Sequence, residues 1–325
     1  MIARVAQTCF WLHRYLERAE NTARLLQVSL HVALDVELPE RELWQPVLAV
    51  SGEEKRFRSL HGTDALDDAE RVQQFMTWEE KNPVSLARSL QLARDNARTI
   101  RETISLEMWQ ALNSCWLWIE DGRGRRLYER ERHAFYERVK TSCQLFHGLY
   151  HTTMLFDEPF DFMRLGSLLE RADQTARILL AMYRPSQGRG RADAPGDAAR
   201  WLATLRSCSA VEPFMKRTRG TLIGSAVAGF LLYDDRFPRS VLHCAGRAQV
   251  FLDRVRGAGD PEAIHESARR LEALVERLRS ARIDMVPDAG LTEELDALLD
   301  GIAAVGQAIT EDFFSMSLPH ASGEF

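Results

Sequence analysis

Long apolar runs are missing from this sequence. No uninterrupted hydrophobic stretch reaches the roughly 18 residues that a membrane-spanning helix needs. The opening stretch MIARVAQTCFWLHRYLERAE places charged side chains inside every apolar segment, which is not the pattern of a signal peptide. We therefore expect a cytoplasmic protein that neither spans nor binds a membrane.

Concentrated positive charge and paired cysteines are missing as well. The formal net charge is −5, and the arginines are interspersed with Glu and Asp, so we expect no surface that binds nucleic acid. The five cysteines are far apart and include no Cys-x-x-Cys pair, which favours buried free thiols over a zinc site.

Familiar catalytic motifs are also lacking. The sequence contains no nucleophile elbow, no Walker loop, no dinucleotide-binding glycine fingerprint and no His-Glu-x-x-His motif. Hydrolases and nucleotide-binding enzymes of the types that carry these motifs are therefore not indicated, and we expect no cofactor.

The alternation of apolar and polar residues that is typical of strands is absent, and helical spacing takes its place. Apolar residues recur three or four positions apart, as in the stripe formed by Leu12, Leu16, Ala19, Ala23 and Leu26. Similar patterns predict helices over residues 84–103, 127–150, 162–183, 239–256, 262–281 and 292–314. The fold class predicted from the sequence is all-α.

Three stretches occur twice, in the same order and at nearly the same separation. YLERAENTARLL at 15–26 matches LLERADQTARIL at 168–179, and FMTWEEKNPVSL at 75–86 matches FLLYDDRFPRSV at 230–241. Between them, Trp44 and Leu48 match Trp201 and Leu205. The repetition predicts two duplicated multi-helix halves, 1–155 and 156–325, packed with pseudo-twofold symmetry. A Gly- and Pro-rich linker is expected at about 184–199.

The repeated dodecamer is the main candidate for an interaction site. On a helix, its polar residues fall on one stripe beside a row of leucines and alanines. Together with the neighbouring arginines, the candidate residues are Glu17, Arg18, Glu20, Asn21, Arg24, Glu170, Arg171, Asp173, Gln174 and Arg177.

Three interpretations of these stripes stay open. They could form buried ion pairs that hold the halves together, since charges on central helices need partners. They could line a pocket that binds a charged ligand through Arg18, Arg24, Arg171 and Arg177. They could form a metal site from Glu17, Glu20, Glu170 and Asp173, but the Glu-x-x-His spacing of di-iron bundles is lacking, so no metal is expected.

A second charged cluster follows further along the chain. Arg94, Arg98 and Arg101 are spaced to form one basic stripe on a helix, which Glu102 and Glu107 could neutralise. A contact to phosphate or carboxylate is the alternative to an ion-paired face.

Several of these stretches resemble the alpha-E family, bacterial all-helical proteins with a recurring Glu-Arg pair. The resemblance is carried by FWLHRYLERAENTARLL, DNARTIRETISLEMWQALN, MRLGSLLERADQTARIL and FPRSVLHCAGRA. It implies a gene neighbourhood that holds a circularly permuted ATP-grasp ligase and a transglutaminase-like protease.

The function that follows from the resemblance is a non-catalytic or accessory component of an ATP-grasp amide- or peptide-ligase system. Such a component would bind the ligase or its peptide substrate. One alternative is a helical hydrolase or transferase that uses the Glu-Arg carboxylates as general acid and base. Another is a carboxylate metal-binding bundle.

Overall fold

The computed structural model describes residues 2–35, 39–183, 195–218, 222–257, 265–281 and 290–315. Within these ranges the chain is helical and has no strand, which confirms the all-α prediction. The first helices are α1 Ala3–Asp35, α2 Glu40–Ser51, α3 Glu54–His61, α4 Ala69–Thr77, α5 Leu86–Thr99, α6 Leu106–Glu120, α7 Arg123–Arg130 and α8 Arg132–Thr153. The later ones are α9 Glu158–Tyr183, α10 Pro195–Ser207, α11 Val211–Thr218, α12 Gly224–Tyr233, α13 Val241–Gly257, α14 Glu266–Ser280 and α15 Leu291–Ile309. A 3₁₀ turn, η1, covers Asp64–Asp67, and a π turn, η5, covers Thr310–Phe314.

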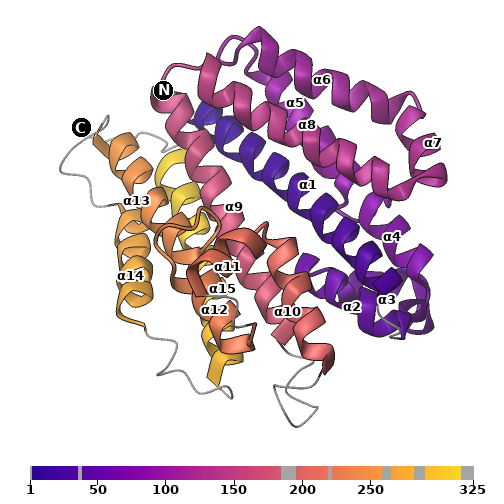
Figure 1. Cartoon of the computed structure of the whole chain (residues 1–325). Helices are drawn as coiled ribbons and strands as arrows, with labels where there is room; N and C mark the ends of the chain where they lie inside the picture. The colour runs from indigo at the N-terminus through magenta and orange to yellow at the C-terminus, as the bar shows by residue number, and fades with distance from the viewer. Residues whose placement is uncertain are drawn as a thin grey trace, which may run out of the picture.

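Two long helices form the centre of the molecule. α1 and α9 lie side by side, with α4–α8 on one side of the pair and α11–α15 on the other (Figure 1). α1 contains no Gly or Pro, so nothing in its sequence interrupts its 33 residues. All residues from Asn21 to Ser29 are buried, which is the environment of a helix surrounded by others.

The covering helices interlock the two parts of the chain. α5 and α8 pack against α1, and α13 and α15 pack against α9. α2 also packs against α9, and α10 packs against α1, so each part contributes to covering the other's central helix. The contact between α1 and α9 therefore lies deep within the fold.

The two central helices approach closely at Gly166. A Cβ atom at this position would lie 2.2 Å from the carbonyl oxygen of Phe10, so only glycine fits without a shift of backbone. Glu170 follows one turn later on α9, and Glu17 lies two turns beyond Phe10 on α1. The close approach thus sets the distance across which the two Glu-Arg pairs face each other.

The matched sequence stretches occupy corresponding helices. The dodecamers lie on α1 and α9, and the buried residues Trp44 and Trp201 lie on α2 and α10. The third pair of stretches forms the α4–α5 and α12–α13 connections. Leu86 begins α5, and Val241 begins α13. Of the expected linker, residues 184–194 lie outside the described residues, and α10 begins at Pro195.

Two predicted helices differ from the observed ones. The helix expected over 127–150 is interrupted, because Glu131 has non-helical backbone angles between α7 and α8. The helix expected over 84–103 ends at Thr99. Within the described part of the chain, no helix combines the length and the apolar character required to span a membrane.

Candidate functional site

The Glu-Arg pairs of the two dodecamers bind each other reciprocally. Arg171 donates to Glu17 from Nε (3.0 Å) and Nη2 (2.7 Å). Arg18 donates to Glu170 from Nε (2.7 Å) and Nη2 (3.0 Å). Both are two-pronged arginine–carboxylate contacts between α1 and α9, and both carboxylates are fully buried.

The first cluster surrounds Glu17 and consists of Glu17, Glu20, Asn21, Arg24, Arg171 and Arg239. Arg239 donates from Nη1 to Glu17 Oε1 (2.9 Å) and Asn21 Oδ1 (3.0 Å), and from Nη2 to Glu20 Oε1 (3.0 Å). Arg24 pairs with Glu20 and donates to Asn21 Oδ1 at 2.9 Å. A single guanidinium from the second half of the chain therefore links three residues of α1.

Arg239 is held in place by the turn that precedes α13. Its carbonyl oxygen accepts a hydrogen bond from Thr175 Oγ1 at 2.9 Å, which ties the turn to the second dodecamer. The next residue, Ser240, accepts from the backbone N–H of His243 at 3.1 Å and so caps the start of α13. Backbone contacts thus fix the direction from which Arg239 reaches α1.

Opposing electrostatic effects act on the carboxylates of the first cluster. Burial and desolvation alone would raise the pKa of Glu17, but Arg171 and Arg239 hold that pKa well below its usual value. Burial and the neighbouring Glu17 likewise work to raise the pKa of Glu20, and Arg239 and Arg24 lower it. Both groups are therefore ionised at neutral pH.

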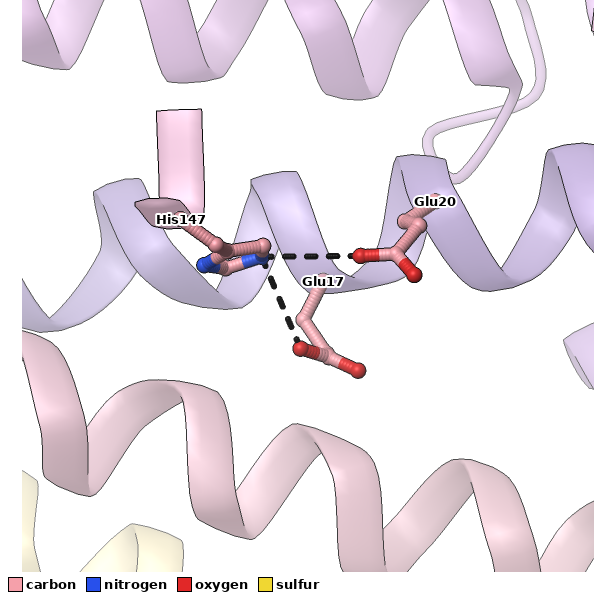
Figure 2. Close-up of side chains that lie close together, drawn as sticks. All are labelled: Glu17, Glu20 and His147. Carbon is pink, nitrogen blue, oxygen red and sulfur yellow. Dashed lines mark ion pairs between the residues drawn. The ribbon is translucent and has the colours of Figure 1, made fainter. Parts of the chain in front are cut away.

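His147 of α8 brings a third potential ligand to these two carboxylates (Figure 2). Its Nε2 atom lies 3.7 Å from Glu17 Oε2 and 3.7 Å from Glu20 Oε2 and has no hydrogen-bond partner among the described residues. Burial lowers the pKa of His147 despite both carboxylates, so the ring is neutral and able to act as a metal ligand.

The charge of the first cluster opposes a divalent cation at this position. Two carboxylates, Glu17 and Glu20, already face three guanidiniums, those of Arg24, Arg171 and Arg239. A bound metal would add two positive charges to a buried site with a surplus of one, at a high electrostatic cost. The geometry therefore suits an ion-paired cluster better than a metal centre.

The second cluster surrounds Glu170 and consists of Arg14, Arg18, Glu170, Asp173, Gln174 and Arg177. Arg14 donates from Nε to Glu170 Oε2 at 2.8 Å, in addition to the contact from Arg18. Burial would raise the pKa of Glu170, but the two arginines lower it to about 2. Arg177 donates from Nε to Asp173 Oδ2 at 2.7 Å.

The second cluster borders an open cavity of about 400 Å³. The cavity lies between α1, α2, α9 and α15, and Met76 of α4 and Val84 of the α4–α5 connection line it as well. Its lining consists of Trp11, Arg14, Arg18, Thr22, Leu25, Val47, Val50, Ser51, Met76, Val84, Glu170, Asp173, Gln174, Arg177, Ile302, Ala303, Gly306, Gln307 and Thr310. Charged groups from the second cluster thus meet a largely aliphatic wall.

One family model covers nearly the whole chain. The Alpha-E family, described as a predicted alpha-helical domain with a conserved ER motif, has a family model that matches residues 1–314. The chain belongs to the Alpha-E family. The Glu-Arg pairs of the two dodecamers, Glu17-Arg18 and Glu170-Arg171, form the reciprocal contacts between α1 and α9.

Relatives of this Alpha-E chain include uncharacterised proteins of Mycobacterium bovis and Mycobacterium tuberculosis. Each is 26% identical over 316 residues, which cover 93% of this chain and 35% of the relative. The chain therefore spans about a third of the length of these relatives. No solved structure matches the chain significantly.

The Alpha-E stripes predicted from the sequence are distributed between the two clusters. The four arginines of the pocket interpretation are divided, since Arg24 and Arg171 lie in the first cluster and, of the four, Arg18 and Arg177 line the cavity. The four carboxylates of the metal interpretation, in which no metal was expected, are divided in the same way. Glu17 and Glu20 meet His147, whereas the acids of α9 face the cavity.

The secondary basic stripe does not form one helical face. Because α5 ends at Thr99, Arg101 lies in the following turn rather than on the helix. Arg94 and Arg101 instead approach the Trp109 ring, at 5.7 and 4.6 Å from its centroid, while Arg98 is exposed. Arg94 also pairs with Asp95 at 3.2 Å, so this arginine is ion-paired within its own helix.

Three residues that complete the two clusters were not predicted. Arg14 lies one turn before Arg18, and this spacing was a usable signal for a shared partner. Arg239 lies within a duplicated stretch, FLLYDDRFPRSV, but its partners on α1 are more than 200 positions away. No sequence pattern marked His147, because α8 meets α1 only through tertiary packing.

Proposed function

We propose that the chain is a non-catalytic, accessory component of an ATP-grasp amide- or peptide-ligase system, and that it binds the ligase or its peptide substrate. A transglutaminase-like protease is the second proposed partner. We propose a cytoplasmic location for the system, because an ATP-grasp ligase would use ATP. The observation that carries the proposal is the cavity of about 400 Å³ beside the second cluster, which Arg14, Arg18 and Arg177 line. A cavity that combines charged and apolar side chains suits the recognition of a partner or its substrate.

The proposal includes an internal duplication with a pseudo-twofold relation between the halves. Reciprocal contacts between the two Glu-Arg pairs support it, because the glutamate of each dodecamer binds the arginine of the other. The placement of the other matched stretches on corresponding helices, α2 with α10 and α5 with α13, supports it further. In this view the α1–α9 contact is the axis of the molecule.

The length of the relatives supports a partner role. In the mycobacterial proteins, the matching region accounts for 35% of the chain, so most of each protein is something else. A helical region joined to a longer chain is placed to work beside another domain. We infer that the Alpha-E region of this chain likewise works beside a partner domain or protein.

A helical hydrolase or transferase remains the second candidate. A general acid would need a raised pKa, but Arg171 and Arg239 lower that of Glu17, and Arg18 and Arg14 lower that of Glu170. Neither carboxylate holds a proton to donate at neutral pH. The pairing with arginines therefore favours the accessory role over acid–base catalysis.

The test is co-purification of the tagged chain from the organism that encodes it. We expect an ATP-grasp ligase in near-stoichiometric amount by quantitative mass spectrometry, and the complex should persist in size-exclusion chromatography. A tagged, unrelated helical protein of similar charge is the control. If the ligase is expressed but does not co-purify or co-elute, the partner role is wrong.

A second measurement separates the accessory role from catalysis. Ligase turnover is measured with and without the chain, and then with Glu17→Gln and Glu170→Gln variants whose folding is checked by circular dichroism. An accessory component should influence turnover only in the presence of the ligase. Turnover by the isolated chain that disappears in a folded Gln variant would establish the enzyme alternative.

A further inference from the structure

We propose that the cavity beside the second cluster is a binding site for the carboxylate group of a small organic molecule. The proposal deepens the proposed function and rests on it for the choice of amino-acid and peptide derivatives as ligands. The cavity itself, its charges and its unused hydrogen-bond donors are properties of the fold.

Unused donors are the first argument. Arg14 and Arg177 each donate to a carboxylate only through Nε, which leaves both terminal nitrogens without an acceptor among the described residues. Arg18 leaves Nη1 without one in the same ranges. The three side chains line the cavity, so these N–H groups are available to a ligand acceptor.

Charge selects the kind of acceptor. The cavity is lined by three guanidiniums, Arg14, Arg18 and Arg177, and by two carboxylates, Glu170 and Asp173, and no other charged residue lines it. The surplus of one positive charge matches one carboxylate. A phosphate dianion would leave the cavity with a surplus of negative charge, and a cationic ligand would add to the positive surplus.

Comparison with the first cluster shows why there is space. When the two duplicated stretches are aligned on Pro83 and Pro238, Val84 corresponds to Arg239. In the first cluster, the Arg239 guanidinium fills the polar centre and binds α1. In the second, the short Val84 side chain lines the cavity and supplies no polar group.

The apolar residues of the lining indicate the rest of the ligand. Trp11, Leu25, Val47, Val50, Met76 and Ile302 contribute apolar surface. A volume of about 400 Å³ lies in the range of roughly 300–1,000 Å³ typical of small-molecule pockets. A carboxylate with an apolar body the size of one or two amino-acid residues matches both features, as at the C-terminal end of a short peptide.

Isothermal titration calorimetry with matched probes tests this proposal. The probes are N-acetyl-L-alanine, N-acetyl-L-leucine and N-acetyl-L-phenylalanine, each paired with its uncharged amide, and inorganic phosphate. We expect at least one acid to bind and its amide to bind at least about tenfold more weakly, because the amide loses the charge-assisted hydrogen bonds.

Two variants and a control locate the binding. Arg177→Gln removes unused donors and should weaken acid binding about tenfold. Ala303→Trp places a large side chain at an exposed position of the lining and should abolish binding. Arg277→Gln is the matched control, because Arg277 is similarly exposed (43% against 34% for Arg177) and pairs with an acid away from the cavity. Its affinity should equal that of the wild type.

The outcomes are distinct. Three results with the wild-type chain would each overturn the proposal. These are equal affinity for an acid and its amide, tighter binding of phosphate than of any acid, and no binding of any acid even after the ligand concentration is raised 10-fold. An unchanged affinity in both Arg177→Gln and Ala303→Trp would overturn the location. These titrations contain no ligase, so the two proposals can fail separately. Carboxylate binding without ligase co-purification would contradict only the partner role. Ligase co-purification without carboxylate binding would contradict only the proposed ligand of the cavity.

Discussion

Replacing Glu17 by glutamine removes one negative charge from the centre of the fold. Glutamine keeps the shape of the side chain and one acceptor oxygen, so the main change is electrostatic. Arg171 and Arg239 both donate to this carboxylate, and each side chain is largely buried. After the substitution, two largely buried guanidiniums are left with less counter-charge.

The structure sets the size of the effect. Removing one partner of a buried ion pair costs about 3–5 kcal/mol, because the remaining charge is left uncompensated. Since domains are stable by only about 5–15 kcal/mol, the loss is a large part of the free energy of unfolding. Glu20 still binds Arg239, so we expect the lower half of this range for Glu17→Gln.

Urea unfolding followed by circular dichroism measures the change in unfolding free energy. The control is Asp67→Asn, because Asp67 accepts two hydrogen bonds from Arg41 at 2.9 and 2.6 Å in the same two-pronged geometry. That pair is exposed, with 40% of the Arg41 side chain and 56% of the Asp67 side chain accessible, so its loss should cost at most about 1 kcal/mol.

A double variant tests the origin of the effect. Replacing Glu17 by Gln and Arg171 by Met together removes both charges of the pair, so Arg171 no longer remains as a buried charge without its partner. The double variant should therefore lose less stability than the sum of the two single variants. Additive losses, or a Glu17→Gln variant no less stable than Asp67→Asn, would refute the reasoning.

Three further predictions follow from packing and charge. Gly166→Ala should lower the unfolding free energy by about 1–3 kcal/mol, whereas Gly246→Ala, which meets no atom within 4 Å on its helix, should not destabilise in the same assay. The stability supplied by Glu170, with a pKa of about 2 in the folded state, should be complete above pH 4.5 and decline toward pH 2 in acid titrations; flat stability over this interval would contradict it. All five cysteines are buried, and burial raises the pKa of Cys9 and Cys208 to about 12, so a thiol reagent should label the native chain far more slowly than the urea-unfolded chain.

Local patterns account for the part of the site that was predicted. Glu20 and Arg24 lie four positions apart on one helix, and so do Asp173 and Arg177, and both pairs form as their spacing predicts. Their separation into two clusters was not predictable from the spacing. It depends on how α1 and α9 face each other at Gly166, a contact between residues far apart in the chain.

The sequence by itself determined the helical class, the positions of most helices and the polar stripes, because these follow from periodicity within a few turns. It also displayed the repeated Glu-Arg pairs that carry the resemblance to the Alpha-E family. Only the tertiary structure decided what completes each stripe. Arg239 and His147 approach Glu17 and Glu20 from other parts of the chain and complete the first cluster, whereas Val84 lines the cavity beside the second. Whether a buried charge meets a side chain or a cavity depends on the packing of distant segments, and no local spacing encodes it.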